Sequence, residues 1–249
     1  MQLYMQKINL KSSDIPIVIY DRQGINTAAR LWFILKIFGM NNISILDGGL
    51  EKWQSEGLPL ETTPIPSVLE SNIDPLVEGY DFKQNKKYVK EYKYTCAMSD
   101  LLSKPSPQTL SRIIDARPPL RFLGFANEPG DRKSGHMPGS KNLYNKYCMN
   151  KDFTYKSKDE LLELFDKYEL DLNENGNIIH ISGIGLSACS NIVAFEIAGY
   201  TNNVIYDGGW TDWGEKYVIP EPDVSPKDIM QDAYQERLKK IFGEKYEKL

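Results

Sequence analysis

The stretch from Ile178 to Cys189 combines residue types that could hold an anion or position a nucleophile. It opens on apolar residues typical of a short buried strand, continues into a loop containing Gly183 and Gly185, and leads to apolar residues at helical spacing over 191–198. In a strand, loop and helix of this order, the loop N–H groups and the helix N-terminus converge on the first loop residue. That residue is Ser182, so its identity decides which chemistry the loop can support.

A serine at this position needs a base before it can act as a nucleophile. His180 lies two residues earlier on the predicted strand, where its side chain should share a face with Ser182. A Ser–His pair, as in a hydrolase, is therefore one interpretation, and a hydrogen-bonded core histidine is the commoner one. Cys189 falls inside the predicted helix, where we expect a buried thiol without a catalytic role.

Cysteine usage and composition exclude several classes of function. The three cysteines have neither CxxC nor Cys/His spacing, which predicts a reducing compartment and no disulfide, zinc site, other metal site or cofactor. A net charge of −4 gives no basic surface for nucleic acid, and no apolar run approaches the roughly 20 residues that a transmembrane helix needs. The first residues show no secretory signal.

The elements that position this loop occur twice in the chain. Residues 15–21 predict a strand, residues 28–38 a helix that ends at Gly39, and residues 43–46 a second strand, and the same order follows from residue 178 onward. This alternation predicts an α/β fold with parallel sheets flanked by helices. The two copies share three anchors, with one residue deleted between them: Asp21 aligns with Ser182, Gly24 with Gly185, and Asp47-Gly48-Gly49 with Asp207-Gly208-Gly209.

The first copy lacks elements that the second has. A strand predicted at residues 112–117 precedes Ser182 by a long interval, whereas few residues precede Asp21. A parallel sheet without its opening strand and helix exposes an edge and an apolar face. We therefore expect that either the N-terminus has been lost or a protein partner completes the first domain.

These patterns divide the chain into four parts. We predict a truncated domain at residues 1–60, a linker at 61–94, a complete domain at 95–220, and an amphipathic helical tail at 221–249. The tail begins with Ser225 as N-cap and Pro226 at the first helical position. It either folds back onto its own core or docks on another protein. Its apolar residues at helical spacing are Ile229, Met230, Tyr234, Leu238, Ile241, Phe242, Tyr246 and Leu249.

Five motifs in this order resemble the second domain of a tandem rhodanese. The loop is most similar to that of 3-mercaptopyruvate sulfurtransferases. The resemblance implies two rhodanese-like domains and a loop cysteine that carries sulfur as a persulfide to cyanide, thiols or thioredoxin. It also implies a mitochondrial location, with the cytoplasm as the alternative. The motifs are Asp115-Ala116-Arg117, Arg121-Phe122, Gly135-His136-Met137-Pro138-Gly139, the loop at Ser182, and Tyr206-Asp207-Gly208-Gly209-Trp210.

The chain departs from this family at several functional positions. Ser182 stands where the family has its cysteine, and Ile184 where it has a serine. Gly130 follows Glu128-Pro129 where the family has a substrate-binding arginine, and only Arg132 lies nearby. From these departures we predict that the chain has no catalytic residue and keeps the remnant of an anion-binding or substrate-binding site. That remnant comprises Ser182, Gly183, Ile184, Gly185, Leu186, Ser187 and Arg121.

The sequence thus favours a pseudoenzyme that serves as a structural or accessory subunit of a larger, mitochondrial assembly. Its protein partner would complete the first domain, dock the C-terminal helix, or do both. An active sulfurtransferase in which Ser182 is an engineered replacement of a natural cysteine is the alternative. A module that senses anions through the loop is a third interpretation. We expect structural roles for His136 and for a charge-assisted bond between Asp115 and Arg117.

Overall fold

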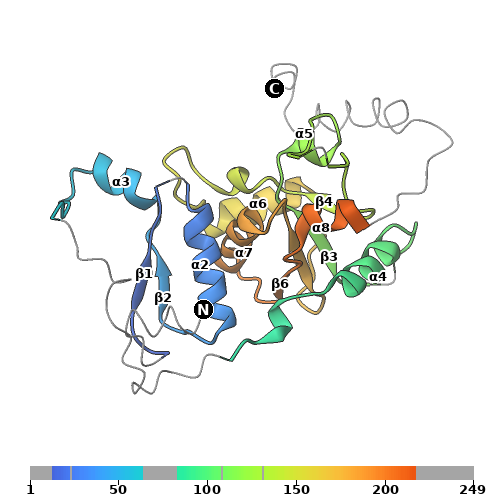
Figure 1. Cartoon of the computed structure of the whole chain (residues 1–249), viewed down its shortest axis with the longest axis horizontal. Coiled ribbons are helices and arrows are strands. Elements are labelled where there is room, and N and C mark those ends of the chain that lie inside the picture. The colour runs from blue at the N-terminus through green and yellow to red at the C-terminus, as the bar shows by residue number, and fades with distance from the viewer. Residues whose placement is uncertain (1–12, 23, 64–82, 108, 131, 217–249) are drawn as a thin grey trace.

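The computed structural model describes residues 13–22, 24–63, 83–107, 109–130 and 132–216 (Figure 1). Its strands form two parallel sheets with helices packed against them, which confirms the predicted α/β class. The division into two domains, the first one incomplete, stays a prediction. The predicted tail at 221–249 lies outside the described residues. Of the predicted linker at 61–94, residues 64–82 also lie outside them, and only 61–63 and 83–94 are described.

The smaller sheet pairs β1 (Ile17–Ile19) with β2 (Ile43–Ile45), and α2 (Asn26–Ile37) connects them. Helix α3 (Gly49–Ser55) follows β2. Both strands are shorter than predicted, and α2 begins two residues earlier than predicted. The earlier start has a local cause, because the Asp21 carboxylate accepts the N–H groups of Thr27 and Ala28 in the first turn of α2.

The larger sheet has the strand order β4-β3-β5-β6, and all of its pairs are parallel. Since parallel strands share a carboxyl edge, Asp115 and Ile181 lie side by side there and the segments that follow β3 and β5 meet. The strands are β3 (Arg112–Asp115), β4 (Lys141–Asn142), β5 (Ile178–Ile181) and β6 (Asn203–Ile205).

Helices cover both faces of the larger sheet. One face packs with α4 (Tyr92–Leu102) and α8 (Gly209–Lys216), and the other with α7 (Leu186–Ala198) and α6 (Lys158–Lys167). Shorter helical segments are η2 (Lys86–Tyr88), α5 (Pro119–Phe122) and η3 (Asn145–Cys148).

Two helix starts differ from the sequence prediction. Helix α4 begins at Tyr92 rather than Ala97, because Tyr92 and Tyr94 pack against the core of the sheet. Helix α7 begins at Leu186 rather than Asn191, since Gly185 adopts a left-handed φ of 85° and caps it. The loop that opens at Ser182 is consequently shorter than the sequence suggested.

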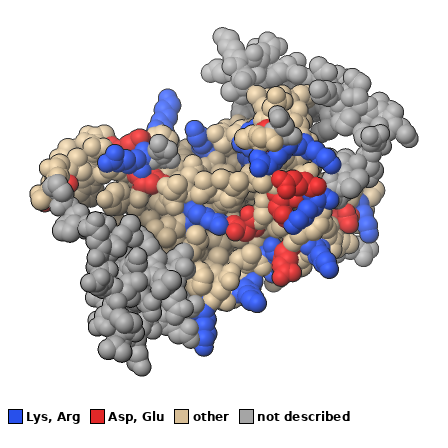
Figure 2. All heavy atoms as spheres, in the orientation of Figure 1, with Lys and Arg blue, Asp and Glu red and all other residues tan. Residues whose placement is uncertain are grey.

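Helices α2 and α7 pack against each other between the two sheets (Figure 1). One continuous apolar cluster includes Phe33 of α2 and Phe195 of α7, and an ion pair joins Lys36 to Glu196 at its surface. On the face shown in Figure 2, basic and acidic side chains are interleaved rather than gathered into a patch of one sign. None of the helices in the described ranges has the length and hydrophobicity that crossing a membrane requires.

His180 on β5 gives the fold a pH-dependent stability. Its side chain is fully buried, and burial lowers its pKa from 6.5 to about 4, although its Nε2–H donates to Asn203 Oδ1 at 2.9 Å. As the pH falls below 6.5, His180 becomes protonated in the unfolded chain, whereas in the folded chain it stays neutral until the pH nears 4. We expect this difference to remove up to about 3 kcal/mol of the free energy of unfolding.

Urea unfolding at several pH values checks this expectation. The free energy of unfolding should fall with pH between 6.5 and 4 in the natural chain, and less steeply in His180→Gln. His136→Gln is the matched control and should keep the steep fall. Equal slopes for the natural chain and His180→Gln would contradict the assignment.

Candidate functional site

Ser182 lies at the carboxyl end of β5, where its side chain is almost fully buried. Its Oγ accepts the N–H of Gly185 at 2.9 Å, which closes the loop on itself. The Ser182 carbonyl accepts the N–H of Trp210 at 2.7 Å, and the Gly183 carbonyl accepts that of Thr211 at 3.1 Å. The first turn of helix α8 therefore holds the loop through its carbonyl groups, and the serine hydroxyl oxygen accepts a hydrogen bond from within the loop.

The predicted remnant residues lie together around this loop. Gly183 is half-buried, Ile184 is 64% exposed, and Gly185 is buried. Leu186 and Ser187, both half-buried, form the first turn of α7. Their joint placement is observed, whereas a binding role for them stays a prediction.

The Ser–His pair is not formed. His180 Nε2 bonds to Asn203, and its ring packs edge-on against Phe195 of α7 at a centroid distance of 4.7 Å. Its Nδ1 has no hydrogen-bond partner. A histidine that faces the core, with a pKa lowered to about 4 by burial, gives Ser182 no base, so the Ser182–His180 pair is wrong.

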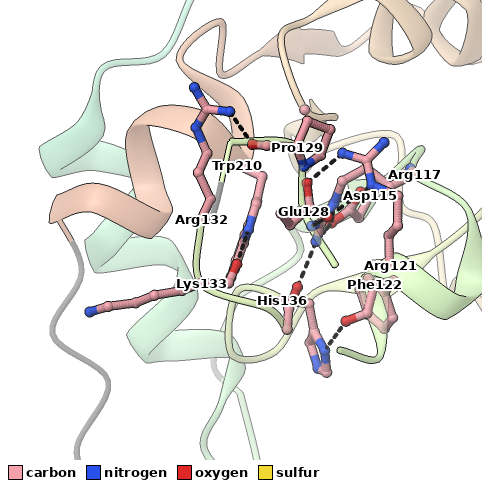
Figure 3. Close-up of polar contacts among 12 residues, drawn as sticks. Asp115, Arg117, Arg121, Phe122, Glu128, Pro129, Arg132, Lys133, His136 and Trp210 are labelled. Carbon is pink, nitrogen blue, oxygen red and sulfur yellow. Dashed lines mark hydrogen bonds and ion pairs between the residues drawn. The ribbon is translucent and has the colours of Figure 1, made fainter. Parts of the chain in front are cut away.

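Next to the loop, a buried network joins two carboxylates and two arginines (Figure 3). Arg117 lies 2.6 Å from Asp115 Oδ2 and 2.9 Å from Glu128 Oε1, and its guanidinium carbon lies 4.4 Å from the centroid of the Trp210 ring. The predicted bond between Asp115 and Arg117 is thus confirmed. Because each charge has a partner, the buried network needs no external ion.

Arg121 extends this network toward the loop. Its Nε donates to Glu128 Oε1 at 3.0 Å, and its Nη2 pairs with Glu128 Oε2. The hydrogen bonds to Glu128 raise the Arg121 pKa despite partial burial. Its Nη2 lies 3.5 Å from the position of a Cβ at Gly183, so the structure brings Arg121 to the loop as predicted. The sequence analysis singled out Glu128-Pro129 but did not predict that Glu128 is the counter-ion of Arg121.

Two further predicted positions have structural roles. Arg132 donates to the Pro129 carbonyl, and in Figure 3 it points away from Arg121. It therefore does not replace the arginine absent at Gly130. His136 Nδ1 lies 2.8 Å from the Phe122 carbonyl oxygen, and its ring stacks on Phe122, as expected of a residue that fixes a turn.

Sequence reasoning missed Arg30, which reaches the loop from α2. Its guanidinium binds Asp207 through two hydrogen bonds of 2.6 and 3.1 Å, and it lies 3.8 Å from Cys189 Sγ. Burial opposes its charge, but the contacts with Asp207 prevail and raise the Arg30 pKa. A Cβ at Gly185 would lie 3.0 Å from Arg30 Nη1. Burial raises the Cys189 pKa to about 11, so this thiol is not a displaced nucleophile.

The aligned loop of the smaller sheet holds a carboxylate. Asp21 accepts the N–H groups of Ile25, Thr27 and Ala28 at 2.9 to 3.0 Å, and the Thr27 hydroxyl at 2.7 Å. Ile25 adopts a left-handed φ of 66° within this arrangement. In this chain, therefore, a loop of the same order as the one at Ser182 binds an anion through its backbone N–H groups.

The sequence profile of the rhodanese-like domain matches residues 1–56 and 97–216, which include both sheets and both loops. The chain belongs to the rhodanese-like family. This confirms the family to which the residues pointed.

Among curated relatives, the rhodanese-like chain is 29% identical to mitochondrial thiosulfate/3-mercaptopyruvate sulfurtransferase 1 of Arabidopsis thaliana, over 82% of this chain and 55% of the relative. It is also 29% identical to 3-mercaptopyruvate sulfurtransferase of Homo sapiens, over 79% of this chain and 62% of the relative. The chain therefore spans less than two thirds of the length of these relatives.

Among solved structures, the sub-stoichiometric sulfur transferase subunit of yeast mitochondrial complex I superposes with a TM-score of 0.71. The sequence identity is 30%, and the match covers 89% of this rhodanese-like chain and 76% of that subunit. Its relatives thus include mitochondrial sulfurtransferases and a subunit of a mitochondrial complex.

The two loops differ in how much stability their first residue supplies. Asp21→Ala removes a charged acceptor from four donors, so we expect the free energy of unfolding to fall by about 2 kcal/mol. Ser182→Ala removes one neutral bond and should cost about 1 kcal/mol or less. Urea unfolding at pH 7 compares the two variants. A larger loss for Ser182→Ala would contradict the role given to Asp21.

Proposed function

We propose that this rhodanese-like chain transfers no sulfur and serves as an accessory subunit of a mitochondrial assembly. The observation that carries the first part is Ser182 at the position of the family cysteine. Loop N–H groups and a helix N-terminus can lower the pKa of a thiol by several units, but a serine hydroxyl stays protonated and forms no persulfide.

The surroundings of Ser182 support this proposal. Its hydroxyl is hydrogen-bonded to Gly185, and the nearby His180 faces the core. Arg121 is neutralised by Glu128, and Arg132 does not supply a second cation. No single replacement accounts for these differences, which favours a natural pseudoenzyme over an engineered Cys→Ser substitution.

The accessory role rests on the family and on the duplicated pattern. The yeast relative is a complex I subunit, and the Arabidopsis relative is mitochondrial. We propose that the two sheets belong to tandem domains at residues 1–60 and 95–220, joined by a linker at 61–94, with a helical tail at 221–249. In this arrangement the smaller sheet offers a surface to a protein partner.

A cyanolysis assay tests the loss of sulfur transfer. With thiosulfate or 3-mercaptopyruvate and cyanide, the natural chain should form no more thiocyanate than Ser182→Ala, because neither can carry a persulfide. Ser182→Cys is the comparison for the engineered alternative, and it should stay inactive because Ile184 and Gly130 also differ. Thiocyanate formation by the chain with Ser182, or turnover by Ser182→Cys together with a cysteine codon in the natural gene, would overturn the proposal.

A second candidate function is anion binding at the Ser182 loop, and the carboxylate of Asp21 in the aligned loop favours it. In the Ser182 loop, sulfate or phosphate would occupy the position that corresponds to the Asp21 carboxylate in the aligned loop. At about a hundred times its Kd, such an anion adds about 2.7 kcal/mol of stability.

Thermal unfolding with sulfate, at constant ionic strength set by chloride, tests this binding. The melting temperature of the natural chain should rise with sulfate, whereas Ser182→Asp should show no rise because its own carboxylate occupies the loop. Leu110→Asp, which adds a carboxylate at an exposed side chain, serves as the control, and its response to sulfate should be unchanged. An equal rise for the natural chain and Ser182→Asp would exclude the loop as the site.

A further inference from the structure

The carboxyl end of α2 borders a cavity that lies away from the Ser182 loop. The cavity encloses about 490 Å³, which is within the size range of small-molecule sites, and its walls come from α2, residues 39–43, residues 83–88 and α7. In Figure 1 the teal segment at 83–90 passes beside the lower end of α2, where the Ile37 carbonyl accepts the N–H of Asn85 at 2.8 Å. We call this cavity the lysine hollow, because Lys36 and Lys83 line it.

The lysine hollow is separate from the Ser182 loop. Glu196 in its wall belongs to the last turn of α7, whereas the loop leads into Leu186, the first residue of that helix. Ten residues of α-helix extend about 15 Å. A ligand in the lysine hollow therefore contacts none of the residues around Ser182.

Lysine side chains gather at the hollow although the chain as a whole is acidic. Residues 83–93 contain five lysines and a single acidic residue, Glu91, in a chain whose net charge is −4. In the described lining, Glu196 is the only carboxylate and faces the two ammonium groups of Lys36 and Lys83. The lining thus carries a net positive charge, which favours an anionic ligand.

Two aromatic rings hold ammonium groups at the walls of the hollow. Lys36 Nζ lies 4.8 Å from the centroid of the Trp32 ring, and Lys87 Nζ lies 4.9 Å from that of the Tyr88 ring. These contacts restrain long side chains before a ligand binds, which lowers the entropy cost of binding. Lys36 also pairs with Glu196, and because an ammonium group has three hydrogens, it can bind a ligand oxygen without breaking that pair.

The two sides of the lysine hollow favour different chemical groups. Where α2 meets α7, Glu196 accepts hydrogen bonds, and the negative end of the α2 dipole disfavours an anion. The opposite side carries Lys83 and Asn85. Asn85 Oδ1 accepts the N–H of Lys87 at 3.2 Å, which leaves the amino group of Asn85 to donate to a ligand. A ligand that satisfies both sides has an anionic group at one end and hydroxyl groups at the other.

We propose that the lysine hollow binds a phosphorylated sugar, either alone or as part of a nucleotide. A phosphate has three acceptor oxygens and nearly two negative charges, so it matches several ammonium groups better than a carboxylate does. Glu196 accepts hydrogen bonds from the sugar hydroxyls, and the Trp32 and Tyr88 rings border the space for a base. This site is independent of the proposed accessory role, since it involves neither Ser182 nor a partner protein.

Isothermal titration calorimetry of the full chain at pH 7 and constant ionic strength tests the proposal. The ligands are ribose 5-phosphate, AMP and inorganic phosphate. We expect saturable binding of ribose 5-phosphate that Lys83→Ala weakens at least fivefold. Lys104→Ala, at an exposed lysine outside the hollow, is the matched control and should leave the affinity unchanged. Tighter binding of AMP would identify a nucleotide as the ligand, and equal affinities would identify a sugar phosphate.

Glu196→Gln tests the contact with the sugar hydroxyls. Loss of the negative charge weakens the acceptor for hydroxyl groups and favours the phosphate. We therefore expect the preference for ribose 5-phosphate over inorganic phosphate to fall at least threefold, a ratio that a general loss of stability would not change.

Several results would overturn the inference. Failure of both phosphorylated sugars to bind, or equal binding to the unmodified chain and Lys83→Ala, would exclude the lysine hollow as their site. Binding that Ser182→Asp abolishes and Lys83→Ala leaves unchanged would place the ligand at the Ser182 loop instead. An unchanged preference in Glu196→Gln would exclude the contact with the sugar. The cyanolysis assay reads only the Ser182 loop, so this proposal and the proposed function fail independently.

Discussion

The contact between α2 and α7 is the constraint on which the rest of this molecule depends. Each helix covers the inner face of its own sheet, so the two sheets share one apolar cluster. Two reciprocal hydrogen-bonded contacts reinforce this packing. Arg30 of α2 binds Asp207 beyond β6, and Asp47 beyond β2 accepts the N–H of Tyr155 at 2.9 Å. The aligned Asp-Gly-Gly turns thus each tie one half of the molecule to the other.

The charges of the network beside the Ser182 loop balance one another. Asp115, Arg117, Glu128 and Arg121 satisfy one another at the carboxyl edge of the larger sheet. Removing one member would leave a buried charge unpaired, which is more costly than the intact network is favourable. The network therefore holds the carboxyl edge of the larger sheet together beside the Ser182 loop.

Local patterns predicted much of the fold and less of the site. Hydrophobic periodicity located both parallel sheets, and glycines marked the ends of α2 and α7, with φ of 83° at Gly39 and 104° at Gly199. The start of α7 was misjudged because its first turn contains the short side chains Ser187 and Ala188, and only the capping geometry of Gly185 reveals it. Arg30 could not be identified, since its partner Asp207 is far away in the sequence and no local pattern joins them.

The position of Arg30 beneath Gly185 has a consequence for cooperativity. The loop at the end of β5 is shaped by a side chain from the opposite half, so its geometry belongs to the whole molecule rather than to the larger sheet. Heat or denaturant that parts α2 from α7 withdraws the guanidinium and the loop loses its support in the same step. We therefore expect the loop and the two sheets to unfold together.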